Sequence, residues 1–139
     1  MTIVRVALAN ITYPTSPDDA VARVRRAIED AAAEGAAIVC LPECYVPGYR
    51  APHKTVPPPN ADFLERAWSE IAAAAGAARV AVVLGTERLV EGVPRIATLV
   101  INSDGTRAGF QDKTQLDPSE EALYSPGCER HLFQVGALT

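Results

Sequence analysis

Ile38-Val39-Cys40-Leu41-Pro42-Glu43-Cys44-Tyr45 is a short apolar run that reaches a proline and then a glutamate. An apolar run of this length, bounded by a turn former, is typical of a buried β-strand. A carboxylate directly after such a strand lies at the carboxyl edge of a sheet, where open α/β proteins build their sites. Glu43 is therefore a candidate functional residue, although taken alone it also fits a solvated loop position.

The residues before this run predict a strand and a helix. Ile3 to Ala9 has the β-branched content of a strand. Ser16 can cap a helix that has Pro17 in its first turn, and Gly35 can end that helix in a left-handed conformation. The opening is therefore a βαβ unit, whose two strands should lie parallel.

The residues after the run predict an irregular loop, a helix and three further strands. The loop, Tyr45 to Asn60, is proline-rich and is either a substrate-shaping loop or a tolerated surface insertion. Asn60 can cap a helix that ends at Gly76. The predicted strands are Arg79 to Gly85, Arg95 to Ile101 and a return through Arg107 to Phe110, separated by the turn signals Glu91-Gly92 and Asn102-Ser103-Asp104-Gly105. This order, β-α-β-α-β-β, predicts a single α/β domain over residues 1–139, with helices for one face of the sheet.

The bulk composition narrows the classes of partner. The net charge is -4 and the 13 Lys and Arg residues are scattered, so no basic stripe for nucleic acid is expected. No apolar run is long enough to span a bilayer, and the amino terminus has no signal-peptide pattern, so no membrane association is expected. Three cysteines, an odd number, favour reduced thiols in a cytoplasmic protein.

Further charged positions follow the last predicted strand. Lys113 lies where that strand is expected to end, as Glu43 does, and beside Asp112 it also fits a simple surface pair. Glu120 and Glu121 come next, where Ser119 with these acids could also cap a short helical turn.

Taken together, these residues resemble the amino-terminal half of the nitrilase (carbon–nitrogen hydrolase) superfamily. The resemblance covers essentially the whole chain and rests on an ordered set of motifs: the opening strand, Leu41-Pro42-Glu43 with Gly48-Tyr49 behind it, Asp112-Lys113-Thr114-Gln115-Leu116, and the glutamates before Pro126-Gly127. It implies one half of a four-layer αββα sandwich.

The resemblance also implies the chemistry. In that family a Glu, a Lys and a Cys form the catalytic triad, and the first two correspond to Glu43 and Lys113. A second glutamate, which orients the lysine and the substrate, would be Glu120, with Glu121 as the neighbouring alternative. The substrate would be a small amide, carbamoyl compound or nitrile, with Tyr49 and His53 as candidate contacts from the loop. No metal and no organic cofactor is implied.

The chain departs from the family in one respect, because the nucleophilic cysteine is missing. Cys40 is expected in the core, Cys44 should point away from Glu43, and Cys128 does not occupy the family's nucleophile context. We therefore expect an incomplete domain whose open sheet face forms an apolar patch, completed by a carboxyl-terminal half or by self-association, with a homo-oligomer for an intact version.

Two other interpretations stay open at this stage. The chain could be a catalytically inactive remnant or split half that acts only by binding a partner chain. It could also be a flavodoxin-like binding domain, which ranks last because the loop around Thr15-Ser16-Pro17 has no glycine-rich phosphate cradle.

Overall fold

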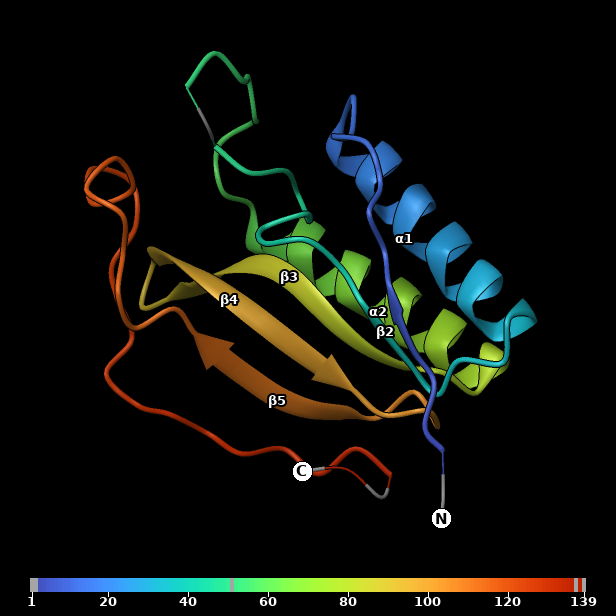
Figure 1. Ribbon diagram of the computed structural model, residues 1–139. Helices are drawn as coiled ribbons and strands as arrows, with labels where there is room; N and C mark the ends of the chain where they lie inside the picture. Colours follow the sequence, from blue (N-terminus) through green and yellow to red (C-terminus); the bar gives the residue numbers. More distant parts are fainter. Residues whose placement is uncertain (1–2, 51, 137, 139) are drawn as a thin grey trace.

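The computed structural model describes residues 3–50, 52–136 and 138. These residues form one mixed sheet of five strands with two α-helices on one face (Figure 1). The elements are β1 (Val6–Leu8), α1 (Pro17–Ala33), β2 (Ile38–Cys40), α2 (Ala61–Ala78), β3 (Ala81–Val90), β4 (Val93–Ile101) and β5 (Arg107–Asp112). The predicted α/β class and the single helix-covered face are both confirmed.

The helices begin where the capping residues predict. The Ser16 side chain accepts a hydrogen bond from the Asp19 backbone N–H, and the Asn60 side chain accepts one from Phe63 N–H. These bonds satisfy backbone donors that the first turn of a helix leaves free. Gly35, with φ of 69°, lies just beyond the end of α1.

The predicted end of the second helix at Gly76 is wrong. Helix α2 continues to Ala78 and is capped by Arg79, which adopts the left-handed conformation. Alanine is the best helix former, so Ala77 and Ala78 extend the helix. Gly76 has a packing role instead, since a Cβ there would stand only 3.0 Å from the Asp104 carbonyl oxygen in the β4–β5 turn.

The sheet follows the chain order, β1-β2-β3-β4-β5. Strands β1, β2 and β3 are parallel, and β3, β4 and β5 are antiparallel. The β3–β4 turn consists of Glu91 and Gly92, both with positive φ, the combination found in the tightest hairpins. The first strand is shorter than predicted, whereas β3 runs five residues past Gly85 because Val93 to Ile101 pairs along its whole length.

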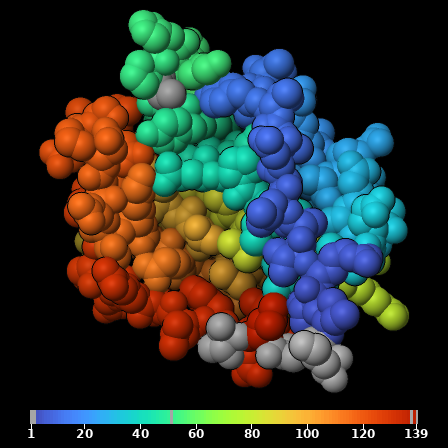
Figure 2. Space-filling model, viewed as in Figure 1, coloured from blue at the N-terminus to red at the C-terminus, as the bar shows by residue number. Residues whose placement is uncertain are grey.

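The two faces of the sheet differ. The core lies between the sheet and the helices, where Ile28, Ile71, Leu84 and Leu99 are fully buried. The opposite face is hollowed over β3 and β4, between the amino-terminal strand, the segment after β2 and the carboxyl-terminal segments (Figure 2). Large apolar side chains are exposed on the segments that border this hollow, among them Leu8 on β1, which is 78% exposed, and Leu132 near the carboxyl terminus, which is 89% exposed. The lining of the hollow is mixed, because Leu41, Val83 and Ile96 stand beside polar and charged residues, so the expected apolar patch is interrupted at the centre of this face.

Candidate functional site

Glu43 is placed by the end of β2 and by a glycine on the neighbouring strand. The Leu41 N–H donates to the Val83 carbonyl at 2.9 Å, which carries the parallel pairing past the last residue of β2. The next two residues then cross directly over Gly85. A Cβ at Gly85 would stand 1.9 Å from the Pro42 carbonyl oxygen and 2.8 Å from the Glu43 Cα. Only a glycine on β3 therefore allows the backbone of Glu43 to take this position.

Lys113 is placed by an extension of the β4–β5 pairing. Its N–H donates to the Ile96 carbonyl at 2.8 Å, and its own carbonyl accepts from Gly127 N–H at 2.9 Å. The side chain then reaches two carboxylates. Its Nζ lies 2.9 Å from Glu43 Oε1 and 3.0 Å from Glu120 Oε2. The structure thus brings Glu43, Lys113 and Glu120 together at one edge of the sheet.

Glu120 is the most enclosed member of this group. Its side chain is 4% exposed, against 27% for Lys113 and 50% for Glu43. Besides Lys113, it accepts hydrogen bonds from the Asp117 N–H at 2.9 Å and from the Tyr49 hydroxyl at 2.8 Å. Glu121 is exposed, so of the two adjacent glutamates Glu120 is the one that reaches Lys113. We call Glu43, Tyr49, Lys113 and Glu120 the rim cluster.

The contacts within the rim cluster shift the pKa values of Lys113, Glu120 and Tyr49. Partial burial alone would lower the pKa of Lys113, but its hydrogen bonds to Glu43 and Glu120 outweigh this and raise it. Burial would raise the pKa of Glu120, yet the Asp117 N–H, Lys113 and Tyr49 together lower it. The hydrogen bond to Glu120 raises the pKa of Tyr49 to about 12. The cluster therefore combines a fixed ammonium, a buried carboxylate and a half-exposed carboxylate.

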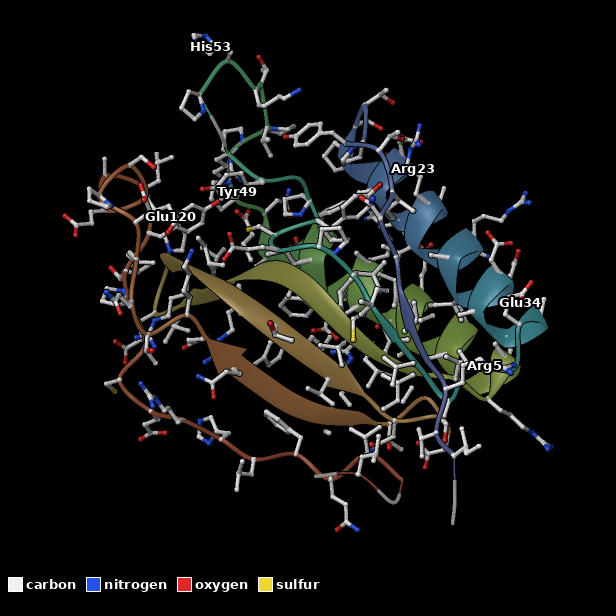
Figure 3. The ribbon with its side chains drawn as sticks, in the orientation of Figure 1. Arg5, Arg23, Glu34, Tyr49, His53 and Glu120 are labelled. Atoms are coloured by element: carbon white, nitrogen blue, oxygen red, sulfur yellow. The ribbon has the colours of Figure 1, made fainter. Side chains whose placement is uncertain are left out.

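The rim cluster faces the hollow on the open side of the sheet. A cavity of about 300 Å³ there is lined by Glu43 and Lys113 together with residues of β3, β4 and β5. Glu43 also lines a second cavity, of about 180 Å³, on the side of Tyr49. His53 lies apart, exposed at the tip of the loop, whereas Tyr49 lies beside Glu120 (Figure 3). The structure therefore does not bring His53 to the rim cluster, and a substrate contact by His53 stays a prediction.

None of the three cysteines joins the rim cluster in the part of the chain that the structure describes. Cys44 is fully buried, and burial with the nearby charge of Glu87 raises the pKa of its thiol to about 12. Burial also raises the pKa of Cys40. Cys128 is exposed and lines a separate cavity with Arg88, Arg95 and Asp112. A thiol that stays protonated is a poor nucleophile, which argues against Cys44 and Cys40.

One buried acidic residue, missed by the sequence analysis, has partners that are close along the chain to members of the rim cluster. Glu87 on β3 is paired with Arg50 through two hydrogen bonds of 2.8 and 3.0 Å, and accepts a third, at 3.3 Å, from the Tyr124 hydroxyl. Glu87 was missed because the predicted strand stopped at Gly85. The signal that could have found it is the apolar residues Leu89 and Val90, which continue the strand beyond this acid.

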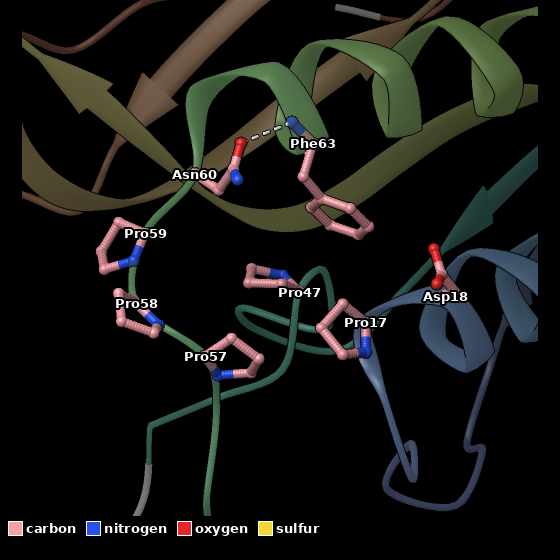
Figure 4. A pocket seen from close by; sticks show the side chains of 8 residues that line it. All are labelled: Pro17, Asp18, Pro47, Pro57, Pro58, Pro59, Asn60 and Phe63. Atoms are coloured by element: carbon pink, nitrogen blue, oxygen red, sulfur yellow. Dashed lines mark hydrogen bonds between the residues drawn. The ribbon is translucent and has the colours of Figure 1, made fainter.

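A larger cavity lies away from the rim cluster. It measures about 540 Å³ and is lined mainly by proline rings and Phe63 (Figure 4). Its amide, Asn60, is occupied in capping α2, which leaves Asp18 as the only charged side chain on its wall. The cavity thus lacks the convergent polar groups of a reaction site.

Two kinds of feature are absent from the residues that the structure describes. No group of three or more His, Cys, Asp or Glu side chains is arranged to hold a metal ion. No helix within these residues has both the length and the apolar character required to cross a lipid bilayer.

Comparison with known proteins agrees with this architecture. The structure superimposes on an amidase of the nitrilase superfamily from Nesterenkonia AN1 with a TM-score of 0.79, at 25% identity, covering 91% of this chain and 49% of the other. For a carbon–nitrogen hydrolase from Helicobacter pylori the TM-score is 0.77 at 17% identity, and the match covers 90% of this chain and 45% of the other. For a glutamine-dependent NAD+ synthetase from Acinetobacter baumannii the TM-score is 0.77 at 19% identity, and the match covers 94% of this chain and 25% of the other. The chain therefore spans half or less of the length of these proteins.

The sequence comparisons lead to the family. No curated protein matches the chain by sequence. The profile of the family described as carbon-nitrogen hydrolase, in contrast, matches residues 5–138. Since this match covers nearly the whole sequence, the chain belongs to the carbon–nitrogen hydrolase family.

Proposed function

We propose that this chain supplies the glutamate and the lysine of a Glu-Lys-Cys triad that hydrolyses a small amide, carbamoyl compound or nitrile. The observation that carries the proposal is the position of Lys113 Nζ, 2.9 Å from Glu43 and 3.0 Å from Glu120, on the wall of an open cavity. A cavity of about 300 Å³ suits a small substrate.

Each member of the rim cluster has a role that its surroundings suit. Glu43 is half exposed and can accept a proton from an incoming thiol as a general base. Lys113 stays protonated, so it can stabilise the negative charge of a tetrahedral intermediate. Glu120 keeps the Lys113 ammonium paired with a carboxylate when Glu43 has taken up the proton, and the Tyr49 hydroxyl donates a hydrogen bond that holds Glu120 in place. Tyr49 also stands at the cavity wall beside Glu43, where it can contact the substrate.

The nucleophile has to come from outside the rim cluster. A solved variant of the Nesterenkonia amidase carries acrylamide on its active-site cysteine. We propose that the corresponding sulfur is delivered to the open sheet face by a complementary carboxyl-terminal half, and that self-association of the chain is the other way in which this face could be covered. The exposed side chains of Val6 and Leu8 on that face favour coverage by another polypeptide.

The test is turnover in a protein completed by a cysteine-bearing carboxyl-terminal half. Glu43→Gln and Lys113→Ala should each reduce kcat nearly to background while the far-UV circular dichroism stays unchanged. Glu121→Gln is the matched control, because Glu121 neighbours the buried Glu120 but is exposed, and it should keep wild-type turnover. Retained turnover in Glu43→Gln or Lys113→Ala would refute the assigned role.

A second candidate function is partner binding without catalysis. It is favoured by the exposed apolar side chains of β1, which lie outside the rim cluster. The same completed protein separates the two: a complex that forms with no turnover on amides, carbamoyl compounds or nitriles would favour the binding role.

A further inference from the structure

Glu87 is a fully buried carboxylate to which the proposed chemistry gives no role. Its side chain is 1% exposed, and Arg50 pairs with both of its oxygens, at 2.8 and 3.0 Å. Burying a charge is costly unless it is paired and hydrogen-bonded, so such a pair imposes a strict geometry on the segments that supply it.

The partners of Glu87 come from segments that also carry the rim cluster. Arg50 directly follows Tyr49 in the chain. Tyr124, whose hydroxyl donates to Glu87 at 3.3 Å, comes four residues after Glu120, and its N–H donates to the Glu120 carbonyl at 2.9 Å. One carboxylate on β3 is therefore in contact with both segments that meet at the Tyr49–Glu120 hydrogen bond.

The segment that carries Glu43 contacts Tyr124 through the thiol of Cys44. Cys44 directly follows Glu43, and its Sγ lies 3.8 Å from the Tyr124 hydroxyl oxygen. We call Cys44, Arg50, Glu87 and Tyr124 the Glu87 cluster. Three of its members are thus close along the chain to a residue of the rim cluster. Arg50 and Tyr124 contact Glu87 directly, and Cys44 contacts Tyr124.

The backbone path of this region does not depend on the Glu87 carboxylate. The Val46 N–H donates to the Gly85 carbonyl at 3.2 Å, and the Glu87 N–H donates to the Val46 carbonyl at 3.1 Å. These bonds hold the start of the loop on β3 whatever side chain residue 87 carries. The carboxylate itself is what orients the segments around Arg50 and Tyr124.

We infer that Glu87 is a positioning residue, which aligns Tyr49 and Glu120 on Lys113 through its contacts with Arg50 and Tyr124. The catalytic purpose of this alignment rests on the proposed function, whereas the alignment itself does not. Glu87 touches no member of the rim cluster through its side chain and takes no part in proton transfer.

The test is the titration of Tyr49 in the 139-residue chain carrying ¹³C-labelled tyrosine. The chain has four tyrosines, and the Tyr49 resonance is assigned by its loss in Tyr49→Phe. In the wild-type chain the hydrogen bond to Glu120 raises the pKa of Tyr49 to about 12, and the titration should show this value. In Glu87→Gln that bond should be lost and the pKa should fall toward the ordinary value near 10. At about pH 11 the ionised fraction of Tyr49 should then rise up to about tenfold.

Two companion variants make the result decisive. Arg50→Lys keeps the charge but loses the two-pronged contact, and it should lower the pKa of Tyr49 in the same direction even where Glu87→Gln does not fold. Val82→Ala destabilises the same strand from the helix-covered face and should leave the Tyr49 titration unchanged. An unchanged Tyr49 pKa in the folded Glu87→Gln or Arg50→Lys chain, or an equal fall in Val82→Ala, would overturn the inference. No nucleophile is required, so this result is independent of the turnover test of the proposed function.

Discussion

Gly85→Ala should displace Glu43 and separate it from Lys113. The new methyl group would stand 1.9 Å from the Pro42 carbonyl oxygen, while Cβ contacts shorter than 3.0 Å essentially never occur, so the two backbones must move apart by about 1.1 Å. Both contacting groups are backbone and cannot rotate away. Overpacking of this kind costs about 1–3 kcal/mol of unfolding free energy. The same displacement is large enough to open the 2.9 Å contact between Glu43 and Lys113.

The loss of the contact between Glu43 and Lys113 can be measured as a change in the reactivity of the Lys113 amine. The chain contains two lysines, Lys54 and Lys113, so Lys54 in the exposed loop serves as an internal reference. A half-exposed ion pair is worth about 0.5–1 kcal/mol, which corresponds to a two- to fivefold change in the free-base fraction of the amine. The acylation rate of Lys113 relative to Lys54, measured by mass spectrometry, should therefore rise about two- to fivefold in Gly85→Ala.

The stability change is measured by urea unfolding, followed through Trp68, the single tryptophan, which packs in the core. Gly92→Ala is the matched control, because a Cβ there meets nothing within 4 Å and the cost is limited to its positive φ. That cost is about 1–2 kcal/mol and should leave the Lys113 to Lys54 ratio unchanged. A Gly85→Ala chain with wild-type stability and a wild-type acylation ratio would refute the reasoning.

Three further outcomes follow from the same contacts. Tyr49→Phe removes a hydrogen bond to the charged Glu120 and should lower the unfolding free energy by about 1.5 kcal/mol in urea titrations, whereas a change below about 0.3 kcal/mol would contradict the contact. The pKa of Glu120 is lowered in the folded chain, so its contribution to stability is present above the ordinary glutamate pKa and is lost as the pH falls through the folded value. Glu120→Gln should therefore weaken the fall of the unfolding free energy with decreasing pH. An unaltered pH dependence would contradict this role of Glu120. Iodoacetamide should modify the exposed Cys128 first and the buried Cys44 last under native conditions, and early labelling of Cys44 seen by peptide mapping would disprove its burial.

The fold was predictable where a local signal decides the outcome. Ser16 and Asn60 fix the helix starts through their own side chains, and Glu91-Gly92 fixes a hairpin because both residues accept positive φ. The errors arose where a distant segment decides. Gly76 looks like a helix terminator but is a contact point for the turn at Asp104, and nothing near it in the sequence announces that contact.

The candidate site divides in the same way. Glu43, Lys113 and Glu120 could be named because they stand in motifs whose order resembles a family, but no local pattern shows that Lys113 Nζ reaches both carboxylates. Glu87 could not be named, since a glutamate in a strand usually indicates a solvated face, and its burial depends on Arg50, 37 residues earlier.

The rim cluster holds its geometry without a sulfur, and this bears on how the chemistry could be divided between polypeptides. Lys113 contacts Glu43 and Glu120, and Glu120 also accepts hydrogen bonds from Tyr49 and from the Asp117 N–H. Of these four contacts, only the one between Lys113 and Glu43 involves Glu43, and none involves a thiol. Protonation of Glu43 would therefore leave the ammonium paired and in place. A nucleophile arriving on the open face would meet a charge arrangement that is already organised, so the cost of alignment falls on the segment that brings the sulfur. For this reason we expect the geometry of Lys113 and Glu120 to be the same in the isolated chain and in a completed protein.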